Sequence, residues 1–256
     1  MRFLTAAHTD VGIAKEVNQD AFCLKVAKTP KAQIVFTVLC DGMGGLRNGE
    51  LASSWLVNAF SAWFENELPV ALKGNISFDQ IKTRWNEIAN EQNKKIGDYG
   101  QNNGFSLGTT LTGLLIVENK FLFIHVGDTR IYRINTAISQ LTKDQTVVAM
   151  ELEKNLITKE QAKTDTRKNV LLQCIGASKS IAPEYVTGTL GINDVFMLCS
   201  DGFRHEVCDE ELLGILASSL LTSEKVMKTC LIDLVELNKT RGERDNITAL
   251  LIKAIK

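Results

Sequence analysis

The sequence predicts an α+β fold in which an antiparallel β-sandwich is covered by helices on both outer faces. Short runs of β-branched and aromatic residues are typical of strands, and several follow one another with only a tight turn between them. Helical patterns occur in pairs between these groups of strands. Local strand pairing interrupted by helix pairs favours two packed sheets rather than an alternating parallel α/β fold.

The strands are expected where apolar β-forming residues are bounded by turn residues. The segment from 110 to 134 resembles a meander, with its first turn at Glu118-Asn119-Lys120. The expected strands lie at 21–26, 34–40, 109–117, 121–126, 130–134, 195–200 and 247–252.

Helices are expected where apolar residues recur at helical spacing or where capping residues occur. Leu51, Trp55, Ala59 and Trp63 predict a helix over 50–67 that ends near Pro69. A capping box at 77–80, acidic residues at 209–211 and a serine at 223 predict three more helix starts. The polar segment at about 143–178, with a short capped helix at 158–161, is expected to form a surface subdomain of one domain spanning 1–256.

Composition restricts the partners that the protein can have. The chain has 256 residues, 45% of them apolar, and a formal net charge of −1. No lysine- or arginine-rich block is present, which argues against nucleic acid or an anionic membrane as the main partner. No apolar run is long enough to span a membrane, the amino terminus does not resemble a secretory signal, and the scattered cysteines are expected to be reduced. These features predict a cytoplasmic protein.

Acidic residues follow or precede several of the predicted strands. Apolar runs lead into Asp41-Gly42, Gly127-Asp128 and Asp201-Gly202, and Asp245 comes just before the last predicted strand. Carboxylates at strand ends can converge at one edge of a sandwich, where they repel one another unless cations lie between them. Oxygen ligands without a histidine or cysteine cluster favour Mg²⁺ or Mn²⁺. Each Asp-Gly pair is equally typical of a turn, so the pattern alone leaves a metal site and a set of turns both open.

Eight ordered sequence blocks resemble the protein phosphatase 2C family, the metal-dependent (PPM) phosphatases, in its bacterial single-domain form. The blocks are VGIAKEVNQDAF (11–22), VLCDGMGG (38–45) with GELAS (49–53), GTTLTGLLI (108–116), HVGDTRIYR (125–133), LTKDQ (141–145), NVLLQCIGAS (169–178), CSDGF (199–203) and RDNIT (244–248). The resemblance implies an α-β-β-α sandwich with a flap at 143–178. It also implies metal-dependent hydrolysis of phosphoserine and phosphothreonine in proteins, reversing a serine/threonine kinase.

The same resemblance implies a metal centre with two Mn²⁺ or Mg²⁺ ions and a position for a third. Asp41 would bridge the two ions, and the Gly42 carbonyl would bind one of them. Asp201 and Asp245 would complete the shell of the other ion. Asp128, together with Asp201, matches the position of the third ion.

Further roles follow from the same blocks. Asp20 would orient metal-bound water, so the implied catalytic residues are Asp20 and the three ligands Asp41, Asp201 and Asp245. Lys15 stands where the family usually has an arginine that contacts the substrate phosphate; lysine keeps the charge but not the bidentate geometry. Gln19 replaces the usual glutamate and removes one negative charge near the metals.

The sequence also allows expectations about the three histidines and about the partners of the protein. His125 ends an apolar strand and is expected to be structural, whereas His8 and His205 have no evident partner. Phosphorylated proteins are the expected substrates, and by analogy with bacterial relatives a Hanks-type serine/threonine kinase or its targets are the expected partners. Because Lys15 and Gln19 depart from the family pattern, two alternatives stay open: a pseudophosphatase that binds phosphoproteins, and a hydrolase of another phosphate ester.

Overall fold

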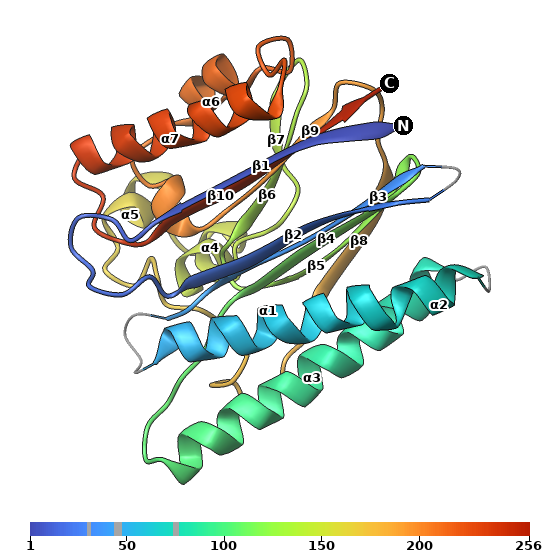
Figure 1. Ribbon diagram of the computed structural model, residues 1–256. Coiled ribbons are helices and arrows are strands. Elements are labelled where there is room, and N and C mark those ends of the chain that lie inside the picture. Colours follow the sequence, from blue (N-terminus) through green and yellow to red (C-terminus); the bar gives the residue numbers. More distant parts are fainter. Residues whose placement is uncertain (30–31, 44–47, 74–76) are drawn as a thin grey trace.

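The computed structural model describes residues 1–29, 32–43, 48–73 and 77–256 (Figure 1). Positions 44–45, the end of the block at 38–45, lie outside the described residues.

Two five-stranded sheets form the centre of the molecule, and every pairing within them is antiparallel. The first sheet has the order β1 (Arg2–Asp10), β10 (Ile247–Ile255), β9 (Val195–Cys199), β6 (Arg130–Ile134) and β7 (Ile138–Gln140). The second has the order β2 (Asp20–Lys28), β3 (Gln33–Asp41), β4 (Leu111–Val117), β5 (Lys120–Val126) and β8 (Glu184–Thr189).

Helices cover the outer face of each sheet (Figure 1). The helices α6 (Asp209–Leu216) and α7 (Glu224–Thr240) lie on the first sheet, after the 3₁₀ turn η1 (Asp201–Phe203). The helices α1 (Gly49–Asn66), α2 (Leu68–Lys73) and α3 (Phe78–Asn102) lie against the second. This arrangement confirms the predicted α+β class and the four-layer α-β-β-α sandwich.

Three apolar layers hold the four structural layers together. Between the sheets, Phe123 and Phe196 belong to one buried cluster. Between the second sheet and its helices, Trp85 is fully buried, and its ring centroid lies 5.3 Å from that of Trp63. Truncating a buried aromatic side chain of this size to alanine costs on the order of 3–5 kcal/mol.

The predicted strands are all present, but three strands of the structure were not predicted. β1, β7 and β8 are edge strands of their sheets, and their residues are mostly half-buried or exposed. Such strands lack a continuous apolar run, because one face and often one edge meet water. The turn between β4 and β5 lies where it was expected, with Val117 paired to Lys120.

The predicted helix starts are also confirmed. Ser77 and Gln80 form the reciprocal capping box of α3, and Ser223 caps α7. The first helix ends at Asn66, and the short helix α2 then contains Pro69, which tolerates a position in a first helical turn. No described helix is both long and apolar enough to cross a membrane.

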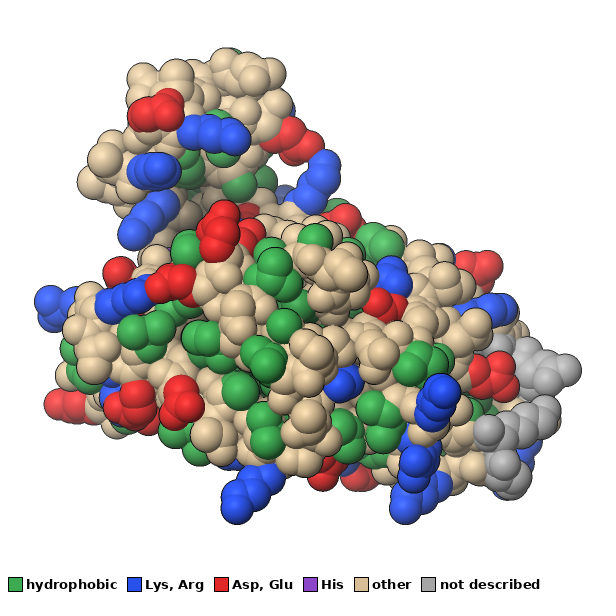
Figure 2. Space-filling view, turned by 90° about the horizontal axis from the view of Figure 1, so that it is seen from above, with side chains coloured by type: hydrophobic (Ala, Val, Ile, Leu, Met, Phe, Trp, Pro, Cys, Tyr) green, Lys and Arg blue, Asp and Glu red, His purple; other side chains and the backbone are tan. Residues whose placement is uncertain are grey.

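The segment from 143 to 178 contains α4 (Val147–Glu153), which was not predicted, and α5 (Lys159–Thr164), whose capping box was. In Figure 2 a lobe stands out from the body where Figure 1 has α4 and α5. The body beside it carries acidic and basic side chains intermixed on the face shown (Figure 2).

Candidate active site

Five aspartates reach one edge of the sandwich from both sheets. Asp20 begins β2 and Asp41 ends β3, and the two are paired directly across the strands. Asp201 follows β9 and Asp245 precedes β10, which is the neighbour of β9 in the other sheet. Asp128 lies in the connection from β5 to β6, where the chain passes between the sheets.

The backbone around Asp41 is held by a pair of threonines. The amide of Asp41 donates to Thr110 Oγ1 at 2.8 Å, and its carbonyl accepts from Thr109 Oγ1 at 2.9 Å. A side chain at Gly42 would overlap the carbonyl oxygens of Gly49 and Gln19. Close backbone packing therefore requires glycine at 42, whatever the Gly42 carbonyl binds.

Asp201 and Asp245 are brought together by a second close approach. A Cβ on Gly202 would overlap the carbonyl oxygen of Asn246, so only glycine lets these two turns touch. Glu243 Oε1 accepts hydrogen bonds from the amides of Arg244 and Asp245, at 2.7 and 2.8 Å. Glu243 thus fixes the turn that presents Asp245.

Asn246 fixes the loop that carries Lys15. Its Nδ2 donates to the carbonyls of Val11 and Val17, at 3.0 and 3.2 Å, and its Oδ1 accepts from the amide of Gln19 at 2.9 Å. Lys15 Nζ lies 3.0 Å from Asp245 Oδ1. The lysine that was predicted to meet phosphate is therefore beside the aspartates, in contact with one of them.

Burial and mutual repulsion shape the protonation of the aspartates. Burial raises the pKa of Asp41 well above its usual range, and the charges of Asp20, Asp201, Asp128 and Asp245 act in the same direction. Burial, partly offset by two nearby hydroxyl groups and reinforced by Asp201 and Asp245, raises the pKa of Asp20 to about 7. Burial and the charge of Asp201 raise that of Asp128 to about 7. All five carboxyl groups thus lie close enough to interact.

The oxygens at this edge fit a hard divalent cation. Both carboxylate oxygens of Asp20 and Oδ1 of Asp201 are buried without a hydrogen-bond partner. Buried oxygens of this kind are costly unless a donor or a cation meets them, and an all-oxygen set suits Mg²⁺ or Mn²⁺. Within the described part of the chain, no three His, Cys, Asp or Glu side chains form a metal-binding group as they stand. Repulsion between bare carboxylates is expected to keep them apart, and a cation would draw them together.

Gln19 has a specific partner that the sequence did not reveal. Its Nε2 donates to Glu50 Oε2 at 3.2 Å. A glutamate at position 19 would place two carboxylates against each other there, whereas the glutamine pairs with Glu50 as a neutral donor.

His205 and Glu243 were missed as site residues. His205 was expected to have no partner, but its Nδ1 lies 3.0 Å from Glu243 Oε2 and its Nε2 lies 3.6 Å from Asp201 Oδ2. The expectation was wrong because Glu243 is distant in sequence. The spacing of four residues between Asp201 and His205 was the one available signal.

His125 is structural, as expected. It is fully buried; Nε2 donates to the Lys143 carbonyl at 3.0 Å, and Nδ1 lies 2.9 Å from Thr112 Oγ1. Because a carbonyl only accepts, the ring hydrogen is on Nε2 and the threonine hydroxyl donates to Nδ1. This neutral imidazole joins β5 to the start of the segment at 143–178.

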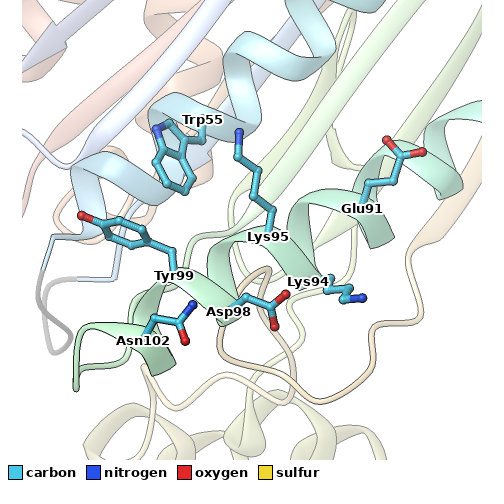
Figure 3. Close-up of a pocket in the computed structure, with 7 residues that line it drawn as sticks. All are labelled: Trp55, Glu91, Lys94, Lys95, Asp98, Tyr99 and Asn102. Carbon is cyan, nitrogen blue, oxygen red and sulfur yellow. The ribbon is translucent and has the colours of Figure 1, made fainter.

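A pocket of about 560 Å³ lies on the outer helical layer (Figure 3). It is lined by residues of α1 and α3, and Lys95 Nζ lies 4.6 Å from the centre of the Trp55 ring. The lining residues are Trp55, Glu91, Lys94, Lys95, Asp98, Tyr99 and Asn102. Charges of both signs alternate there, so its lining favours no single class of ligand.

Comparisons with known proteins agree with the observed fold. The model of the protein phosphatase 2C family matches residues 9–251. Protein phosphatase PhpP of Streptococcus pneumoniae is 30% identical over 247 residues, covering 95% of this chain and 94% of PhpP. The structure of serine/threonine phosphatase Stp1 from Staphylococcus aureus superposes with a TM-score of 0.86 at 28% identity, covering 100% of this chain and 96% of Stp1.

A third similar structure is the catalytic domain of the serine/threonine protein phosphatase PstP, solved in complex with two manganese ions. It superposes with a TM-score of 0.78 at 25% identity and covers 99% of each chain. These relatives favour the enzyme over the phosphoprotein-binding alternative. The chain therefore belongs to the protein phosphatase 2C family and is a metal-dependent protein serine/threonine phosphatase.

Proposed function

We propose that this edge of the sandwich holds two Mn²⁺ or Mg²⁺ ions. In this proposal Asp41 binds both ions, the Gly42 carbonyl binds one, and Asp201 and Asp245 bind the other. Asp20 acts through water, and Asp128 provides the position of a third ion. The manganese-bound PstP relative supports the choice of ion and the number two.

One observation carries the proposal: five carboxyl groups from two different sheets are gathered at one edge, and three of their oxygens are buried without a partner. A protein does not gather buried like charges for stability, because each raises the cost of ionising the others. Divalent cations would remove that cost and would satisfy the free oxygens of Asp20 and Asp201.

The bound ions, Asp20 and Lys15 would each contribute differently to hydrolysis. The bound ions would supply a water of lowered pKa as nucleophile and would neutralise charge on the phosphoryl oxygens. Asp20, with both oxygens unpaired, is suited to orient a water by accepting its hydrogen bonds. Lys15, released from Asp245, would contribute a point charge to the substrate phosphate.

The substrates are phosphorylated proteins, and a protein serine/threonine kinase must supply them, because no other enzyme class places phosphate on those side chains. We infer that such a kinase, of the Hanks type, or its targets are the partners of this phosphatase. We place the enzyme in the cytoplasm, which is supported by six cysteines that are all unpaired.

The test compares the wild-type protein with Asp41→Asn on a phosphothreonine peptide and on p-nitrophenyl phosphate. Turnover should require Mn²⁺ or Mg²⁺ and stop with EDTA, and Asp41→Asn should abolish it, because the variant removes the charge shared by both ions. Asp233→Asn, on the exposed face of α7, is the matched control and should keep full activity. Full turnover by Asp41→Asn would refute the bridging role.

A further inference from the structure

Arg204 lies beside the candidate third-metal position. Its Nη2 is 3.9 Å from Asp128 Oδ2 and 3.4 Å from the Asp128 carbonyl oxygen. The two side chains are 13% and 9% exposed, so water screens their charges only weakly. Asp128 therefore already faces a permanent positive charge, because a guanidinium does not lose its proton in proteins.

The place of Arg204 follows from the turn that presents Asp201. Its backbone amide donates to the Asp201 carbonyl at 3.0 Å, which closes the 3₁₀ turn. The arginine thus leaves the same turn as Asp201 and reaches towards Asp128. No movement of the sheets is needed to bring the guanidinium to Asp128.

Arg204 also contacts the start of the flap segment. Its Nη2 is 3.6 Å from Asp144 Oδ2, and Asp144 receives two hydrogen bonds from Arg130, at 2.7 and 2.6 Å. Charges of alternating sign therefore run from Arg130 of β6 through Asp144 and Arg204 to Asp128. Arg130 already satisfies Asp144 with a bidentate pair, so Arg204 is not needed there for neutrality.

We propose that Arg204 acts as a built-in cation at Asp128 and lowers the affinity of this chain for a divalent ion at that position. The inference rests on the two-ion centre proposed above. A third ion between Asp128 and Asp201 would meet the guanidinium at close range, and repulsion between fixed charges that are poorly screened lowers its affinity. Arg204 would in turn position Asp128 and connect it to the flap through Asp144.

The experiment counts bound Mn²⁺ and measures each affinity by isothermal titration calorimetry, with free Mn²⁺ followed by electron paramagnetic resonance. Arg204→Gln should bind a third ion at least about tenfold more tightly than the wild type, because the repelling charge is gone. Arg204→Lys, which keeps the charge, should resemble the wild type. Arg133→Gln is the matched control, since it removes an arginine that pairs with Asp194 rather than with the site aspartates.

The outcomes separate this inference from the proposed metal centre. Two tight ions in the wild type with no gain in Arg204→Gln would overturn the role of Arg204 alone. A wild type that binds no Mn²⁺ would overturn the metal centre and this inference together. Asp128→Asn gives an independent measure if Arg204→Gln does not fold: it should keep both tight ions, and loss of one would show that Asp128 holds a tight ion despite Arg204.

Discussion

Replacing His125 by glutamine should remove a pH dependence from the stability of the fold. The imidazole is fully buried, and burial disfavours its charged form; in the neutral form its ring nitrogens pair with the Lys143 carbonyl and the Thr112 hydroxyl. Burial lowers its pKa to about 4, although the Lys143 carbonyl and the charge of Asp144 act in the opposite direction. In the unfolded chain the same group titrates near 6.5.

The sign and size of the effect follow from these two pKa values. Between pH 6.5 and about pH 4 the unfolded chain binds a proton that the folded protein does not, so the free energy of unfolding falls as the pH falls. At 1.36 kcal/mol per pKa unit, the loss between pH 7 and pH 5 is about 2 kcal/mol for this one side chain. Above pH 7 the contribution is fully present and constant.

The assay is urea unfolding of the wild type and of His125→Gln at pH 8, 7 and 5, all with EDTA so that metal binding does not contribute. Other groups change the stability of both proteins alike. The difference between the two proteins in how the free energy of unfolding changes with pH therefore isolates His125. The wild type should lose about 2 kcal/mol more than the variant between pH 7 and pH 5, and the two should change in parallel between pH 7 and pH 8. Equal losses at pH 5 would refute the assignment of a buried neutral imidazole.

Three further substitutions test the site and the fold. Lys15→Arg should lower KM for a phosphothreonine peptide, because a bidentate donor holds phosphate better, and an unchanged KM would leave Lys15 without a role in binding. Gly202→Ala should destabilise the protein by about 1–3 kcal/mol and weaken Mn²⁺ binding, because its Cβ would push against the Asn246 carbonyl; wild-type values in urea unfolding and calorimetry would contradict the close approach. Ser77→Ala should cost about 1 kcal/mol through loss of the α3 cap, with activity retained, and an unchanged urea midpoint would count against that cap.

Much of the architecture could be predicted because buried strands and capped helices leave local signals. β3 and β9 are almost continuous apolar runs, and the start of α3 was marked by Ser77 and Gln80. The edge strand β1 was missed, because its half-polar residues pair with β10 from the opposite end of the chain. Pairing of that kind depends on tertiary structure and leaves little trace in a local window.

The candidate site was also only partly predictable from the sequence. Placement of the aspartates at strand ends was visible in the sequence, since an acid after an apolar run is unusual. The residues that hold them were not visible: Asn246 and His205 act through contacts with partners that are distant in the chain, and Glu243 connects His205 to the turn that presents Asp245. Arg204 follows a recognisable motif, yet only the fold places it opposite Asp128.

The aspartates come from both halves of the sandwich, which gives the metal centre a mechanical consequence. Asp20 and Asp41 belong to one sheet, whereas Asp201 and Asp245 flank strands of the other. Ions bound by aspartates of both sheets would link the two sheets at this edge, and any separation of the sheets would disrupt the metal centre. Hydrogen exchange of amides at the carboxyl-terminal ends of β3 and β9, next to the aspartates, should therefore slow when Mn²⁺ is added. Amides at the amino-terminal ends of these strands should change less. The enzyme would then be active only while the two sheets stay close together at this edge.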